Sequence, residues 1–395
     1  MQSVTPLLAA FDLSHPIFLL FAVALGACVG SFLNVVIYRV PLDLSVNKPK
    51  RSFCPVCKGQ IPIWHNLPII SWLMLRGKCA MCGVPISPRY IMVEALTALL
   101  FGIVWVKFAP YGWPLAWMVW IFISLLITAT FIDLEHFIIP DGITIGGMFV
   151  GLTWHAIIPL IPPSLSMQVM FSNPAKNALP NTNWLNGLCM AALGAAAGFL
   201  LIWIVVQLGR LAFGRKVYKF DEPQDWKLHQ PDPDDDILLE VGDETIPGIE
   251  FFGPHSSQLI IEGSDFQING IDFEGDQVII YDEGAYVDGC TIALEDMQEI
   301  SGKATKIRQP REAMGLGDVK FVGMIGAFLG WESTVFTLIA GAVVGAFVAT
   351  MQKAIRRERW SQPIPFGPYL ALGAFVYVFW GKEIVSWYMN WVYFG

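Results

Sequence analysis

Asp318 stands at the head of a long apolar run, directly after Gly315-Leu316-Gly317. Burying a charged aspartate in a bilayer costs about 2.5 to 3.5 kcal/mol on insertion scales, so such a residue marks a functional site by default. Two carboxyl groups within hydrogen-bonding distance cannot both ionise, so one keeps a proton while the other acts as base on a bridging water. This is the chemistry of aspartic proteases, and it requires a second carboxylate. The carboxylates expected at comparable membrane depth are Glu94, Asp133, Glu135 and Asp141.

Four cysteines form a second pattern with chemical meaning. Cys54 and Cys57 form one C-x-x-C pair, Cys79 and Cys82 form another, and 21 residues separate the two pairs. This spacing is typical of a tetrathiolate zinc site, and four thiolates leave no open coordination position, so the sequence predicts a structural zinc ion. Two disulfides are the alternative. The loop is expected in the cytoplasm, however, where thiols are kept reduced.

The composition is that of a membrane protein. The 395 residues have a mean hydropathy of +0.53 and only 15% charged side chains, whereas about a quarter are charged in ordinary soluble domains. The apolar segments predict an α-helical polytopic membrane protein with about eight transmembrane helices. These segments cover residues 17–38, 91–108, 113–132, 139–161, 185–208, 316–330, 333–351 and 366–392.

The distribution of Lys and Arg predicts how these helices are oriented. Eight basic residues lie between Arg39 and Arg89, so the positive-inside rule puts this loop in the cytoplasm and the N-terminus outside. Threading eight helices from there leaves 22 of the 25 basic residues on the cytoplasmic side. Asp133 at the end of the third helix and Asp318 at the start of the sixth then reach the same edge. They are the predicted catalytic pair.

The acidic residues are concentrated in one stretch. Residues 221–300 contain 22 of the 33 acidic residues and a single basic one, which gives this stretch a charge of −21. Alternating runs at 258–262 and 277–281, with turns expected at Gly263-Ser264, Gly275-Asp276 and Asp288-Gly289, predict a small inserted β-rich cytoplasmic domain. The expected organisation is a first helix in 1–38, a zinc loop in 39–90, helices two to five in 91–208, the insert in 209–312 and helices six to eight in 313–395.

In this order, the motifs resemble the type IV prepilin peptidases, which are bifunctional leader peptidases and N-methyltransferases of the bacterial inner membrane. The resemblance rests on Gly30-Ser31-Phe32-Leu33-Asn34, the four cysteines, Val93-Glu94, Asp133 with Pro140-Asp141, and the Gly315-x-Gly317-Asp318 box. It implies that Asp133 and Asp318 cut prepilins and type II secretion pseudopilins between a short basic leader and an apolar helix. The new N-terminal residue would then be methylated with S-adenosylmethionine.

The resemblance also implies the setting of the reaction. It implies a multi-pass inner-membrane protein whose partner is the pilus or secretion machinery, and no nucleic acid is expected. The charge pattern puts the N-terminus in the periplasm and the active site towards the cytoplasm. Zinc, expected from the cysteine spacing, is the second cofactor. No glycine-rich nucleotide loop follows a strand pattern, so the methyltransferase assignment depends on the resemblance alone. Gly30, Asn34 and Glu94 are the residues expected near the methyl donor.

Several alternatives stay open at this point. Asp141 follows Pro140 at a predicted helix start, where N-capping explains it as well as catalysis does, and it would replace Asp133 if Asp133 proved dispensable. Gly315 and Gly317 would support the site by letting the backbone approach an extended substrate. Glu135 and His136 are expected to face water, and Glu94 serves either methyl transfer or a structural hydrogen bond.

A non-proteolytic membrane protein is the competing class of function. One version is a proton-coupled transporter that uses Asp133 and Asp318 as a relay, although such folds often contain internal repeats and this sequence has none that we recognise. The other is a scaffold that docks pilus-assembly proteins on its zinc loop.

Overall fold

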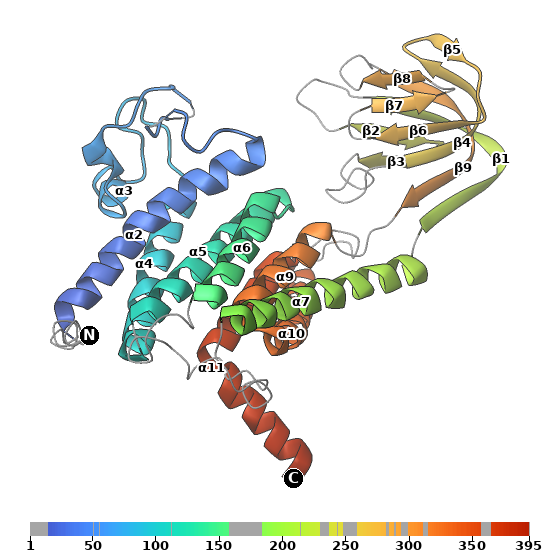
Figure 1. Ribbon diagram of the computed structural model, residues 1–395. Helices are drawn as coiled ribbons and strands as arrows, with labels where there is room; N and C mark the ends of the chain where they lie inside the picture. Colours follow the sequence, from blue (N-terminus) through green and yellow to red (C-terminus); the bar gives the residue numbers. More distant parts are fainter. Residues whose placement is uncertain are drawn as a thin grey trace. The chain divides into compact units, whose positions relative to one another are not determined.

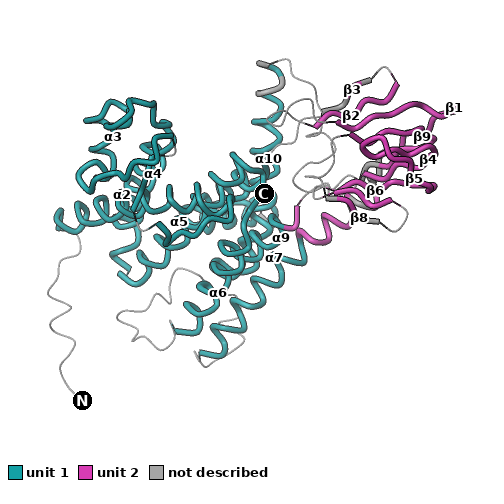
Figure 2. Tube along the Cα trace, turned by 90° about the horizontal axis from the view of Figure 1, so that it is seen from above, with its two compact units in different colours: residues 1–201, 317–356, 365–395 teal, residues 202–316, 357–364 magenta. Residues whose placement is uncertain are grey.

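The structure is a computed structural model that describes residues 15–49, 51–54, 56–111, 113–157, 184–213, 215–229, 237–242, 244–247, 259–281, 284–287, 290–293, 299–310, 315–356 and 365–394. The chain divides into two compact units, coloured separately in Figure 2. A helical unit comprises residues 1–201, 317–356 and 365–395, and a β unit comprises residues 202–316 and 357–364.

Helices form at all eight apolar segments of the sequence (Figure 1). They are α2 (Pro16–Arg39), α4 (Pro88–Phe108), α5 (Trp113–His136), α6 (Asp141–Ile157), α7 (Trp184–Phe213), α9 (Leu316–Leu329), α10 (Trp331–Arg356) and α11 (Gly367–Phe394). Within the described residues, six helices are long and apolar enough to cross a membrane. The count of eight spans is therefore not confirmed, because α6 has 17 residues and α9 has 14, fewer than the roughly 20 that a span needs.

The helices that carry the two aspartates are the most enclosed. In an apolar 18-residue stretch of α5, 67% of the residues are buried, whereas the corresponding share is 22% in α2 and in α10. Every residue of α9 from Phe321 to Leu329 is buried. The rings of Phe122 on α5 and Phe328 on α9 lie with their centroids 4.9 Å apart, so the two helices are in direct contact.

Glycines allow neighbouring helices to approach α9 closely. A Cβ on Gly194 or Gly198 of α7 would overlap a backbone carbonyl of α9, and a Cβ on Gly147 of α6 would overlap the side chain of Met324. Small residues four positions apart are the usual means by which helix backbones pack together in membranes. The helix that carries Asp318 is thus held on several sides.

The connection between α2 and α4 folds into a compact loop with one short helix, α3 (Ile70–Met74). Arg39 at the end of α2 is buried, and its guanidinium donates hydrogen bonds of 2.9 to 3.1 Å to the carbonyls of Ser45, Val46 and Pro49. This residue therefore folds the start of the loop back towards the end of α2.

The β unit contains one antiparallel sheet, which confirms the predicted β-rich region. Its strands are β1 (Arg215–His229), β2 (Leu238–Val241), β3 (Glu244–Pro247), β4 (Leu259–Ile268), β5 (Ile271–Phe273), β6 (Gln277–Tyr281), β7 (Gly284–Val287), β8 (Cys290–Ala293) and β9 (Glu299–Pro310). They lie in the order β3-β2-β1-β9-β4-β6-β7-β8, and β5 pairs with β4. Trp226 and Phe266 are the bulkiest side chains of its buried core.

The turn predicted at Gly263-Ser264 is wrong. Both residues lie inside β4, where the register against β9 shifts, and a Cβ on Gly263 would overlap the carbonyl oxygen of Lys303. This glycine therefore marks a β-bulge with close backbone contact. The tight turn of this region is Asn269-Gly270, which joins β4 to β5 with φ angles of 52° and 80°.

Candidate active site

Asp133 lies in the last turn of α5, and the residue is only 4% exposed. The helix ends because Phe137 adopts a left-handed φ of 55°, and the N–H of Phe137 donates to the carbonyl oxygen of Asp133 at 2.9 Å. This C-cap reverses the chain within a few residues. Ile139 follows and is buried.

The carboxylate of Asp133 contacts the start of α11. The backbone N–H of Gly367 donates to Asp133 Oδ2 at 2.8 Å, and both residues are buried. The two positions are 234 residues apart in sequence. Helix packing, and not local sequence, produces this contact.

Asp318 lies in the first turn of α9 and is 7% exposed. It is 10 residues before Phe328, and Asp133 is 11 residues after Phe122. At a rise of about 1.5 Å per residue, the aspartates lie about 15 Å and about 16 Å along their helices from the contact between these two phenylalanines.

Ile139 connects the surroundings of the two aspartates. A Cβ on Gly317 would lie 3.3 Å from Ile139 Cβ, and a Cβ on Gly367 would lie 3.0 Å from Ile139 Cδ1. Asp133 and Asp318 are therefore at the same end of the α5 and α9 pair. Gly315, the remaining glycine of the motif, is buried directly before α9.

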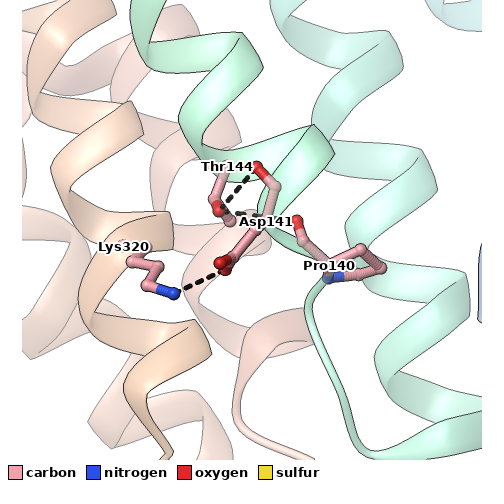
Figure 3. A network of polar contacts seen from close by, with 4 residues as sticks. All are labelled: Pro140, Asp141, Thr144 and Lys320. Carbon is pink, nitrogen blue, oxygen red and sulfur yellow. Dashed lines mark hydrogen bonds and ion pairs between the residues drawn. The ribbon is translucent and has the colours of Figure 1, made fainter.

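Asp141 has a different environment (Figure 3). Its carboxylate pairs with Lys320 Nζ at 2.6 Å, and 59% of its side chain is exposed. At the same helix start, the Thr144 hydroxyl lies 3.4 Å from the carbonyl oxygens of Pro140 and Asp141. Asp141 thus forms a surface ion pair between α6 and α9, whereas Asp133 and Asp318 are enclosed.

The four cysteines come together in the loop between α2 and α4. Their Sγ atoms all lie within 4.8 Å of one another, and Cys54 Sγ is 3.9 Å from Cys82 Sγ. With zinc–sulfur distances of about 2.3 Å, tetrahedral geometry requires sulfur atoms slightly less than 4 Å apart. All four are free thiols, so the alternative of two disulfides is not supported.

The two halves of the cluster have matching backbones. The N–H of Lys58 donates to the carbonyl of Cys54, and the N–H of Gly83 donates to that of Cys79, both at 2.9 Å. Backbone N–H groups also point at the sulfurs: those of Cys57 and Val56 lower the pKa of Cys54, and those of Cys82 and Met81 lower the pKa of Cys79 to about 7. Such donors stabilise thiolates, which are the form that binds a metal.

A cavity of about 770 Å³ lies between this cysteine cluster and the ends of three helices. Asn34 of α2, Glu94 of α4, and Glu135 with His136 at the end of α5 contribute to its lining, together with Cys54 and Cys79 of the loop. This volume is within the usual range for small-molecule sites, which is about 300 to 1,000 Å³. The cavity extends to within two residues of Asp133.

Two polar groups in this cavity have unusual environments. Asn34 is 2% exposed, and its Nδ2 donates to the Tyr90 carbonyl at 2.9 Å, but its Oδ1 has no hydrogen-bond partner among the described residues. Glu94 is 8% exposed and accepts a hydrogen bond of 2.7 Å from the N–H of Ile69. Ile69 has a φ of 63°, which is a genuine outlier for a β-branched residue. Strained backbone of this kind clusters at functional sites.

The remaining predicted residues divide between cavity and packing roles. Gly30 does not line the cavity: it is buried between α2 and α4, where a Cβ would lie 2.8 Å from Glu94 Cα. Glu135 and His136 are exposed as predicted and border the cavity, and Glu135 also forms an ion pair with Arg89.

Sequence reasoning missed Gly367 and Ile69. The sequence contains a signal for the first, because Gly367-Pro368 is a typical helix start. No signal in the sequence identifies its contact with Asp133. The positive φ of Ile69 has no sequence signal either, since isoleucine is among the residues least expected there.

Comparison with known families agrees with the motifs. The family model described as Bacterial Peptidase A24 N-terminal domain matches residues 24–108, and the one described as Type IV leader peptidase family matches residues 304–350. These ranges contain the four cysteines and Asp318. A prepilin leader peptidase/N-methyltransferase of Aeromonas hydrophila is 26% identical over 388 residues, which cover 92% of this chain and 90% of the relative. The chain is therefore similar to prepilin leader peptidases along most of its length.

Two further relatives carry the same name. The protein of Stutzerimonas stutzeri is 26% identical over 403 residues, covering 96% of this chain and 97% of its own length. The protein of Myxococcus xanthus is 50% identical over 139 residues, which cover 35% of this chain and 40% of the relative. No solved structure matches this chain.

Proposed function

We propose that this protein cleaves the leader of type IV prepilins and type II secretion pseudopilins and then N-methylates the new N-terminal residue. The observation that carries the peptidase proposal is the burial of Asp133 and Asp318 at the same end of two packed helices. Two buried carboxyl groups at neighbouring helix ends are the arrangement that aspartyl hydrolysis needs. The relatives named for both activities support the double function.

For cleavage, we assign the base to Asp133 and the acid to Asp318. The water oxygen attacks the scissile carbonyl carbon while Asp133 takes a proton from the water, and protonated Asp318 donates its proton to the carbonyl oxygen. When the carbon–nitrogen bond breaks, the amine leaves with the proton held by Asp133, and Asp318 recovers a proton from the diol. Gly317 supports the site because a side chain there would press on Ile139.

For methylation, we assign the cavity that is lined by Asn34 and Glu94 to the methyl donor. S-adenosylmethionine would supply an electrophilic methyl group on a sulfonium centre. The buried Glu94 carboxylate suits a cationic group, and the unpaired Asn34 Oδ1 is an acceptor that awaits a donor. Gly30 would act indirectly, by allowing α2 and α4 to pack closely enough to form this wall.

We propose that Cys54, Cys57, Cys79 and Cys82 hold a structural zinc ion. The spacing of their sulfurs and the N–H groups that face them support this. Because Cys54 and Cys79 also line the cavity, the ion would fix one wall of the methyl-donor site.

We further propose an inner-membrane protein with eight crossings, a periplasmic N-terminus and a catalytic edge that faces the cytoplasm. In this arrangement α6 and α9 cross as short helices, and α9 is enclosed by its neighbours. The concentration of basic residues in 39–90 supports the orientation. A basic leader would then stay in the cytoplasm while the apolar helix of the prepilin lies in the bilayer beside Asp133 and Asp318.

Purified protein in detergent should release the leader from a prepilin and, with S-adenosylmethionine, add one methyl group to the mature N-terminus. Mass spectrometry of the products measures both steps. A protein that leaves the prepilin intact under these conditions would contradict the proposal and favour a transporter or a scaffold.

A further inference from the structure

In the first turn of α11, one N–H group is left to donate to an acceptor outside the helix. That acceptor is the carboxylate of Asp133. The first N–H groups of a helix have no partner within the helix. Those of Tyr369 and Leu370 both donate to the carbonyl of Phe366, at 3.1 and 3.2 Å, and Pro368 has no N–H. The N–H of Gly367 remains, and it donates to Asp133 Oδ2 at 2.8 Å.

Any residue other than glycine at position 367 would force the neighbouring atoms to move. A Cβ on Gly367 would lie 2.7 Å from Asp133 Oδ2 and 3.0 Å from Ile139 Cδ1. Real Cβ atoms essentially never approach another atom to less than 3.0 Å. An alanine would therefore displace the carboxylate or the start of α11.

The Gly367 N–H lies at the start of α11, which also suits the negative charge of the Asp133 carboxylate. The N-terminus of a helix carries a partial positive charge that attracts anions, and α11 is 28 residues long. The N–H of Gly367 donates to one lone pair of Oδ2, so this oxygen already has a donor and protonation is favoured on Oδ1.

We propose that Gly367 is a positioning residue for leader cleavage: its N–H fixes Asp133 so that Oδ1 faces the water and receives its proton. This rests on the proposed peptidase function. The α11 start would then be a third component of the peptidase site, besides α5 and α9. Gly367 itself touches neither water nor substrate in this role.

The test compares Gly367→Ala with Gly146→Ala. Gly146 lies in α6, and nothing is found within 4 Å of a Cβ built there, so the control makes the same substitution without the contact. A displacement of about 1 Å costs up to about a hundredfold in rate, so kcat for prepilin cleavage should fall about 10- to 100-fold in Gly367→Ala. KM should change by less than about threefold, since the change is at the water and not at the binding surface.

Methyl transfer to a peptide that is already cleaved should be equal in wild type, Gly367→Ala and Gly146→Ala. A normal kcat in Gly367→Ala would overturn the inference while leaving the proposed function intact. A wild type that does not cleave prepilin would instead overturn the proposed function.

A second comparison applies even if Gly367→Ala does not fold. Asp133→Asn keeps an oxygen that accepts the Gly367 N–H, whereas Asp133→Ala removes it. The melting temperature of Asp133→Ala should be about 2 to 4 °C below that of Asp133→Asn, as for the loss of a helix cap. Equal melting temperatures would show that residue 133 does not hold the start of α11 and would overturn the inference.

Discussion

The aspartate site and the zinc-loop cavity are built in opposite ways. The aspartate site takes Asp133 from α5, Asp318 from α9 and Gly367 from α11, so helix packing assembles residues that are distant in sequence. The cavity takes most of its lining from residues 31–94, so it is formed by one loop and the two helices that flank it. The two activities should therefore respond separately to substitution, although Glu135 borders the cavity two residues from Asp133.

Removing either buried aspartate should separate the activities most clearly. Asp133→Ala and Asp318→Ala should each reduce prepilin cleavage by at least about 10³-fold, because the acid and the base act as a unit. Methyl transfer to a synthetic mature N-terminus should stay within about twofold of wild type. Gel separation of cleaved and uncleaved prepilin measures the first rate, and mass spectrometry measures the second. Loss of both activities would show that the sites are not independent.

The two sites also differ in how far sequence could predict them. The cysteine cluster was evident from its spacing alone, because C-x-x-C pairs form local turns that bring the sulfurs together. Asp133 and Asp318 required the helix ends to be counted and threaded through a membrane. The contact of Gly367 with Asp133 cannot be predicted from the sequence, since it depends on how α5 packs against α11, which no local pattern encodes.

The fold shows the same division between local and non-local information. The apolar segments predict the positions of eight helices to within a few residues, because long apolar segments are local signals. The turn at Gly263 was misplaced because a glycine in a strand can mark either a turn or a bulge. At Gly263 the close carbonyl oxygen of Lys303 requires a glycine in a bulge. The position of Lys303 depends on how β4 pairs with β9, which the local sequence does not show.

Loss of the zinc ligands should damage the cavity more than the aspartate site. Cys54→Ser should lower the zinc content measured by atomic emission and reduce methyl transfer by at least about tenfold, since a structural ion holds its loop folded. Cleavage should fall by less than about threefold. Cys189→Ser is the matched control, because Cys189 is an exposed thiol on α7 outside the cluster. Undiminished methyl transfer in a zinc-free protein would contradict a role of the cysteines in the cavity wall.

Asn34→Ala should have a smaller effect that is limited to methylation. Leaving a buried partner without its hydrogen bond costs about 1 to 3 kcal/mol, so KM for S-adenosylmethionine should rise about tenfold, with cleavage unchanged. Thr97→Ala is the control, because Thr97 is a buried polar residue of α4 that does not line the cavity. Equal KM values in Asn34→Ala and wild type would remove Asn34 from the methyl-donor site.

The smallest effect is expected at Asp141, and it decides which carboxylate pairs with Asp318. The ion pair of Asp141 with Lys320 is largely exposed, and such pairs contribute about 0 to 1 kcal/mol to stability. Asp141→Asn and Lys320→Ala should therefore each keep cleavage within about threefold of wild type, and the double variant should resemble the single ones. If Asp141→Asn instead abolished cleavage while Asp133→Asn left it intact, Asp141 would be the catalytic partner. The contact of Asp133 with Gly367 would then serve only to anchor α11.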